Sequence, residues 1–126
     1  MINEPKDWFD QAEYDYETAI YMVKGERYVY AVFMCHLAIE KALKGLVLKA
    51  SHLPPPKIHS LIQLTKKAEL NPPEDIGHFL VSLDQASIPT RYPEDLTTVK
   101  KIYTKIKTDE IVSKTKETLV WLKKMS

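Results

Sequence analysis

The sequence predicts an all-α protein, built as an up-and-down bundle of four helices with one additional short helix. Three observations support this prediction. Apolar residues recur at the three- and four-residue spacing of amphipathic helices, and no segment shows the apolar–polar alternation of a strand. Only three of the 126 residues are glycine, which disfavours a β fold rich in tight turns. We therefore expect one helical domain over residues 1–126.

The first two helices are expected to be long. Residues 5–24 form the first helix, which ends at Gly25, and residues 28–50 form the second, which ends before the prolines at 54–56. The second segment has large apolar residues on one face and small residues on the other. We expect both faces to be covered, by helices of this chain or of a second subunit. The small residues are Ala31, Ala38, Ala42 and Gly45.

Prolines also divide the middle of the chain. A third helix is expected over residues 57–69, and the prolines at 72–73 separate it from a fourth helix over residues 74–87. The segment from Ser87 to Pro93 is predicted to be a loop, because it contains two prolines.

The last part of the chain is expected to be helical in two pieces. Residues 94–107 show partial helical periodicity, and residues 109–125 form the final helix. Thr108 is the expected N-cap of that helix, because a hydroxyl there can accept a bond from the first turn, where Asp109 and Glu110 also favour the helix start.

Charge is unevenly distributed although the net charge is only +1. Residues 1–23 carry six acids and one lysine, whereas residues 100–126 carry eight lysines and three acids. Either the two segments form oppositely charged helix faces that lie side by side, or the lysines of the second segment form a basic edge that binds phosphates. The acidic N-terminus lacks a signal pattern and no apolar stretch is long enough to span a membrane, so a cytoplasmic location is expected. Cys35, the only cysteine, is expected to be a buried apolar residue.

Three polar residues interrupt the large apolar face of the second helix. His36, Glu40 and Lys44 are spaced four residues apart, so they form one polar line along the helix. Buried charges need partners, and His36 can bond Glu40 while Glu40 pairs with Lys44. The line is either a satisfied strip that fixes helix register or a polar seam that opens into a cleft or dimer groove.

Three further residues are candidates for phosphate or nucleotide binding. Arg91 is one of only two arginines, and its planar guanidinium suits carboxylates and phosphates, while Tyr92 adds a ring and a hydroxyl beside it. Arg91 either binds a phosphate or ties its loop to a carboxylate such as Glu40 or Asp95. His59 contacts the polar line or caps its own loop. The spacing of histidines predicts no metal site, and no glycine-rich cofactor motif is present.

The order of these motifs resembles the HEPN family, the higher eukaryotes and prokaryotes nucleotide-binding domain. Trp8 with Ala12 and Tyr16 is similar to the family's first helix, and the Glu-Lys-Ala-Leu-Lys sequence within residues 33–46 is similar to its second. Two further segments match the pattern of the family. They are Pro56-Lys57-Ile58-His59-Ser60-Leu61 and Thr90-Arg91-Tyr92-Pro93-Glu94-Asp95, the latter resembling a loop of a bacterial and archaeal branch.

The resemblance implies a function as well as a fold. It implies a homodimer with polar residues lining a groove, and members are often encoded beside a minimal nucleotidyltransferase, in some cases as toxin and antitoxin. Several branches are metal-independent ribonucleases that use an arginine followed four to six residues later by a histidine. Neither arginine of this chain has such a histidine.

The sequence therefore leads to one main interpretation and two alternatives. The main one is a nucleotide-binding module that acts as a homodimer with a nucleotidyltransferase and needs no cofactor. The first alternative is a metal-independent ribonuclease with His36 or His59 as the base and Arg91 as the cation. The second is a purely structural interaction module. The candidate ligand-binding residues are His36, Glu40, Lys44, His59, Arg91 and Tyr92.

Overall fold

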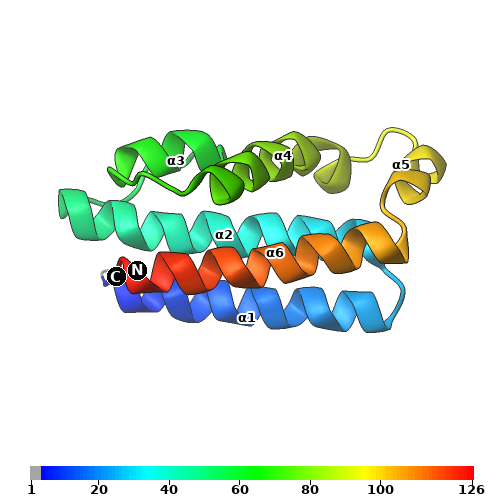
Figure 1. Ribbon diagram of the computed structural model, residues 1–126, viewed down its shortest axis with the longest axis horizontal. Helices are drawn as coiled ribbons and strands as arrows, with labels where there is room; N and C mark the ends of the chain where they lie inside the picture. The colour runs from blue at the N-terminus through cyan, green and yellow to red at the C-terminus, as the bar shows by residue number, and fades with distance from the viewer. Residues whose placement is uncertain (1–3) are drawn as a thin grey trace.

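The computed structural model describes residues 4–126, and within them it contains six helices and no strand. Four long helices run up and down, with the C-terminus beside the start of the first helix (Figure 1). The all-α prediction is therefore confirmed. The helices are α1 (Pro5–Lys24), α2 (Tyr28–Ser51), α3 (Leu61–Lys67), α4 (Glu74–Arg91), α5 (Leu96–Ile102) and α6 (Lys105–Lys124).

Helix α2 is the centre of the bundle. In Figure 1, α1 and α6 lie on one side of it, and α3 and α4 lie on the other. Fifteen of its 24 residues are buried, which explains why both its large and its small residues face neighbours. Cys35 is fully buried in this core, and burial raises the pKa of its thiol to about 11.

The small-residue face of α2 includes a close approach to α1. A Cβ atom added to Gly45 would lie 3.0 Å from Cβ of Trp8 and 3.1 Å from the carbonyl oxygen of Pro5. Ala31, Ala38 and Ala42 are fully buried. The helix that covers Gly45 is therefore α1 of the same chain, and this part of α2 is not free to contact a second subunit.

Helix α4 continues past the end expected from the sequence. It runs to Arg91 with Pro89 inside it, so the predicted loop from Ser87 to Pro93 is wrong for residues 87–91, which are helical. A proline inside a helix loses one backbone hydrogen bond and disfavours the helix. Packing outweighs that cost, because Thr90 is fully buried and its hydroxyl donates to the carbonyl of Ala86 at 2.7 Å. Arg91 consequently lies in a helical turn and not in a loop.

Two other helix starts differ from the prediction. Helix α3 begins at Leu61, four residues later than expected, because Ser60 is its N-cap and accepts from the backbone N–H of Gln63 at 3.2 Å. Helix α6 begins at Lys105 with Thr104 as its N-cap, and the expected cap, Thr108, is a fully buried helical residue. In both cases a hydroxyl side chain caps the helix and sets its first residue.

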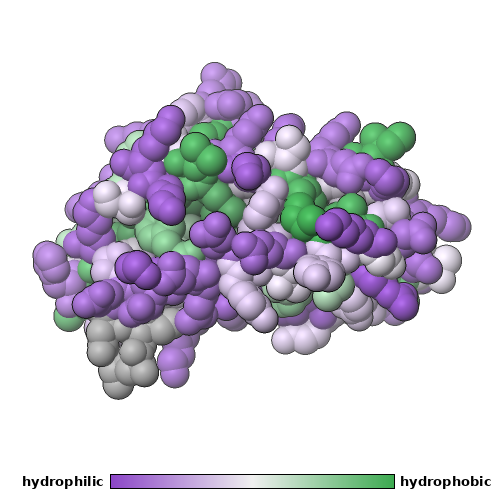
Figure 2. Space-filling model, turned by 90° about the horizontal axis from the view of Figure 1, so that it is seen from below, coloured by the Kyte–Doolittle hydropathy of each residue, from purple (hydrophilic) through white to green (hydrophobic). Residues whose placement is uncertain are grey.

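The oppositely charged segments are neighbours in the structure. Asp10 and Glu13 of α1 line the same shallow groove as Lys116 and Lys123 of α6. The face that includes α1, seen from below in Figure 2, is mostly hydrophilic with hydrophobic patches between the charged residues. None of the helices in residues 4–126 combines the length and apolar character needed to cross a membrane.

Candidate functional site

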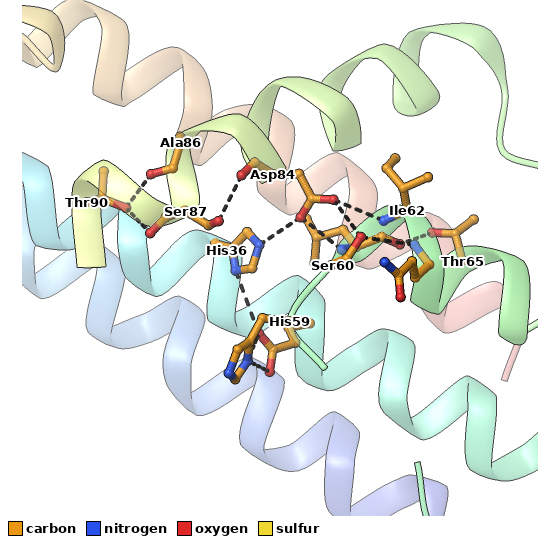
Figure 3. A network of polar contacts seen from close by, with 12 residues as sticks. His36, His59, Ser60, Ile62, Thr65, Asp84, Ala86, Ser87 and Thr90 are labelled. Carbon is orange, nitrogen blue, oxygen red and sulfur yellow. Dashed lines mark hydrogen bonds and ion pairs between the residues drawn. The ribbon is translucent and has the colours of Figure 1, made fainter. Parts of the chain in front are cut away.

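The carboxylate of Asp84 joins three helices at one point (Figure 3). It projects from α4 and accepts hydrogen bonds from the backbone N–H groups of Leu61 at 2.9 Å and Ile62 at 3.1 Å. The hydroxyl of Ser60 donates to it at 3.3 Å. The first N–H groups of a helix have no partner within the helix, so Asp84 and Ser60 together satisfy the start of α3.

His36 connects this point to the central helix. Its ring is fully buried, and Nε2 donates to Oδ1 of Asp84 at 3.0 Å. Nδ1 lies 3.8 Å from Oε1 of Glu40 and has no hydrogen-bond partner in the described part of the chain. That distance is too long for the direct His36–Glu40 bond expected from the sequence. His36 therefore reaches from α2 to α4 instead of along its own helix.

The environment of Asp84 favours its charged form. Partial burial acts to raise the pKa of the carboxyl, but the hydrogen bonds from His36, Leu61 and Ile62 outweigh burial. The pKa is therefore held below its usual value of 3.8. The cap of α3 and the contact with His36 both depend on this negative charge.

Glu40 is the second buried carboxylate. It is 3% exposed, and Nζ of Lys44 donates to Oε2 at 3.1 Å. Nδ1 of His59 lies 3.1 Å from both carboxylate oxygens. Lys44 also lies 5.9 Å from the centre of the Trp8 ring, within the range of a cation–π contact. The charge of Glu40 is thus paired on both sides, as burial requires.

His59 places one ring nitrogen at the surface. Its side chain is 60% exposed, and the contact with Glu40 uses only Nδ1. Nε2 has no partner among the residues that the structure describes. A carboxylate that accepts from Nδ1–H orients the ring and leaves Nε2 as a proton acceptor. This is the arrangement of a general base or of a ligand-binding imidazole.

Arg91 is held against an aromatic ring and not against a carboxylate. The central carbon of its guanidinium lies 4.8 Å from the centre of the Phe33 ring. Among the described residues, no ion pair links it to Glu40 or Asp95, the carboxylates proposed for it from the sequence. Its Nη2 atom is buried and lacks a hydrogen-bond partner within residues 4–126. The fold fixes the position of this cation but leaves part of its hydrogen-bonding capacity unused.

His59, Arg91 and Tyr92 line one open groove, here called the α3–α4 groove. Its volume is about 500 Å³, and Ser60 and Asp84 also line it. Three of the six candidates from the sequence therefore meet at the surface. The other three, His36, Glu40 and Lys44, lie buried beneath it and reach it only through Asp84 and His59. Among the described residues, no cluster of three or more metal-ligating side chains is present.

Comparison with known proteins identifies the family. The family model described as HEPN domain matches residues 5–125. The chain belongs to the HEPN domain family. The structure is similar to the crystal structure of TT1696 from Thermus thermophilus, with a TM-score of 0.83, 29% identity and 98% of each chain covered. It is also similar to that of ST0689, described as an archaeal HEPN homologue, with a TM-score of 0.78, 32% identity and 98% of each chain covered. No curated protein matches this HEPN domain.

Sequence reasoning missed two acids of this HEPN domain. Asp84 lies four residues after Leu80, on the buried side of α4, so a search for partnered acids on apolar faces finds it. Asp15 of α1 is 5% exposed and pairs with Lys41 of α2 at 2.9 Å. Both acids bond residues of other helices, which spacing within a single helix does not reveal.

Replacement of Asp84 by asparagine is expected to lower the free energy of unfolding by roughly 1–3 kcal/mol at neutral pH, because charged hydrogen bonds are lost. The folded pKa of Asp84 lies below the unfolded value, so its contribution is complete above the usual pKa of 3.8. It is lost as the pH falls through the lower folded value. Urea unfolding at neutral and acidic pH measures this dependence.

The matched control is Glu94→Gln, which removes an exposed carboxylate with no hydrogen bond to any described residue. The wild type and this control should lose stability in acid more steeply than Asp84→Asn. Equal acid dependence of all three proteins would show that Asp84 does not hold α3 as described.

Proposed function

We propose that this protein is a nucleotide-binding HEPN module that acts as a homodimer and pairs with a minimal nucleotidyltransferase, in the manner of a toxin–antitoxin system. One observation carries the binding proposal: Arg91 lines the α3–α4 groove, and its guanidinium forms no ion pair or side-chain hydrogen bond within residues 4–126. Guanidinium groups bind phosphate oxygens through two parallel hydrogen bonds. A phosphate in the groove supplies the partner that the fold does not.

The rest of the groove suits the other parts of a nucleotide. Nε2 of His59 and the hydroxyl of Ser60 are polar groups for phosphate or sugar. Tyr92 is 70% exposed, so its ring offers an apolar face to a base. Base–aromatic stacking tolerates any base, so the groove selects for nucleotides in general and not for one of them.

The homodimer proposal is supported by the exposed side of α4. Val81, Ile88 and Tyr92 are large apolar residues on this helix and its C-cap, and all are more than two-fifths exposed. Ile88 and Tyr92 line both the α3–α4 groove and a second groove beside Asp95 and Val99. A second copy packed by two-fold symmetry on this ridge buries Val81 and Ile88 and brings the two α3–α4 grooves together.

Replacement of Ile88 by aspartate is expected to convert the dimer to a monomer, because the charge lies at the centre of the proposed interface. Sedimentation velocity of wild type and variant measures the state. The control is Ile106→Asp on α6, which adds the same charge at a residue that is 76% exposed and outside both grooves. The interface is misassigned if the wild type is a monomer, or if both variants dissociate alike.

Arg91→Ala is expected to weaken binding of ATP, GTP and short RNA by about tenfold to a hundredfold, because a charge-assisted bond contributes about 1.5–3 kcal/mol. Equilibrium titration of the full chain measures the affinity. Lys101→Ala removes an exposed cation that does not line the α3–α4 groove and controls for loss of charge. The binding proposal fails if none of these ligands binds at millimolar concentration and Arg91→Ala has no effect.

The same titration separates this proposal from a purely structural module. A structural role for the buried line predicts that His36→Gln and Glu40→Gln lower the melting temperature by equal amounts with and without nucleotide. A binding role predicts that nucleotide raises the melting temperature of the wild type. The partner enzyme is inferred from the family resemblance alone, and a small nucleotidyltransferase encoded beside this chain would support it.

A metal-independent ribonuclease is the second candidate, and the Glu40–His59 contact favours it. Glu40 orients His59 through Nδ1, so Nε2 faces solvent in the same groove as Arg91. Cleavage of RNA without a metal needs a base to remove the proton of the ribose 2′-hydroxyl and a cation to stabilise the charged phosphorane. Nε2 of His59 and the guanidinium of Arg91 supply these two groups, although the family's Arg–His spacing is missing.

This candidate predicts RNA cleavage in EDTA that is lost in both His59→Ala and Arg91→Ala. Loss of one catalytic group typically lowers the rate by about 10²–10⁴-fold. Gel assays of a labelled RNA measure the rate, and His78→Ala removes an exposed histidine of α4 as a control. Activity that survives in the His59 and Arg91 variants, or that His78→Ala also abolishes, rules out this mechanism.

A further inference from the structure

We propose that a second pocket, at the other end of the bundle, binds the phosphate and ring of a nucleoside phosphate. The pocket lies where the turn between α1 and α2 meets α5, at the end of the molecule opposite the C-terminus (Figure 1). It has a volume of about 460 Å³ and shares no lining residue with the α3–α4 groove. We call it the α2–α5 pocket; its side chains include Arg27, Tyr28, Tyr30, Leu96, Lys100 and Tyr103.

Two cations of the α2–α5 pocket are available to an anion. Arg27 and Lys100 are exposed, and neither forms an ion pair within residues 4–126. One carboxylate, Glu26, lines the same pocket, so the cations are in excess. Arginine and lysine both bind phosphate, one as a planar fork and the other as a point charge.

The side chain of Tyr103 is a second observation that points to a ligand. Tyr103 lines the α2–α5 pocket and is only 8% exposed, and burial raises the pKa of its hydroxyl. That hydroxyl makes no hydrogen bond to any described residue. A hydroxyl on the pocket wall without a protein partner is free to donate its proton to a phosphate or sugar oxygen of a ligand.

The backbone beside these side chains also favours an anion. Helix α2 has Arg27 as its N-cap, with no side-chain cap and no acidic residue in its first turn. The N–H groups of its first turn belong to Tyr28, Val29 and Tyr30, and these residues line the pocket. Uncapped N–H groups at a helix start carry partial positive charge, which adds to the attraction of Arg27 and Lys100.

The remaining surface fits a flat ring and not a lone phosphate. Tyr30 is 48% exposed and Leu96 is 49% exposed, so an apolar rim stands next to the two cations. A volume of this size is in the range of pockets for small organic ligands. A nucleoside phosphate, either free or at the end of an RNA strand, combines the ring and the charge that the pocket accommodates.

The test is a titration of the full chain with AMP and with a short 5′-phosphorylated oligoadenylate, followed by amide chemical shifts. We expect shifts at Leu96, Lys100 and Tyr103, which distinguish this pocket from the groove of Arg91. The double variant Arg27→Gln with Lys100→Gln should bind AMP about tenfold or more weakly, and Tyr103→Phe about fivefold more weakly. Lys101→Gln, on the same helix but outside the pocket, should change the affinity less than about twofold.

The relative affinities of these ligands and variants either identify the ligand of the α2–α5 pocket or overturn the proposal. Equal affinity for AMP and the RNA identifies a free nucleotide as the ligand, whereas much tighter binding of the RNA identifies a strand end. The proposal is overturned if adenosine or inorganic phosphate binds as tightly as AMP, or if Tyr103→Phe keeps full affinity. It is also overturned if Lys101→Gln weakens binding as much as the double variant. Failure of the nucleotide proposal for the α3–α4 groove would instead appear as unchanged shifts at Arg91 and Tyr92.

Discussion

The carboxylate of Asp84 is the constraint on which the arrangement of α2, α3 and α4 depends. It comes from α4, caps the start of α3 through two backbone N–H groups, and accepts a hydrogen bond from buried His36 of α2. Apolar packing alone fixes the distance between helices but tolerates sliding and rotation. A charge that satisfies directional donors on two other helices tolerates neither, because any shift leaves a buried donor without a partner. Short α3 owes its position to this contact, since seven residues are too few for a helix to be stable alone.

The buried polar line of α2 combines the structural and functional interpretations. His36 and Glu40 are almost completely buried, so neither has direct access to solvent. Each acts on one surface group: His36 holds Asp84, and Glu40 holds His59. A strip that fixes helix register therefore also fixes the side chains of the groove. The free-energy cost of burying these polar groups is offset by the pairing of Glu40 with Lys44 and by the hydrogen bond between His36 and Asp84.

The sequence predicts those features of the fold that depend on residues close together in the chain, and it fails for features that depend on contacts between helices. The bounds of α1 and α2 follow from prolines, a glycine and helical periodicity, all of which act within a few residues. The burial of His36 and Glu40 follows from the same periodicity. The extension of α4 through Pro89 does not, because it depends on burial of Thr90 against other helices. Thr104 caps α6 in place of the predicted Thr108, because packing between helices buries Thr108.

Arg91 differs from the other polar residues of the site, because the fold fixes its position without giving its guanidinium a polar partner among the described residues. For Asp84, Glu40 and His36, a partner in another helix or another turn satisfies most of the polar atoms. For Arg91, the fold supplies a position, through the last turn of α4 and the ring of Phe33, but no partner for Nη2 within residues 4–126. A buried donor without an acceptor disfavours the isolated folded state. The guanidinium as a whole has no ion pair within residues 4–126, and a phosphate or an acidic group of a second copy in the α3–α4 groove would supply one. The hydroxyl of Tyr103 also has no protein partner among the described residues, so we expect binding at two surface pockets whose walls include a side chain without such a partner.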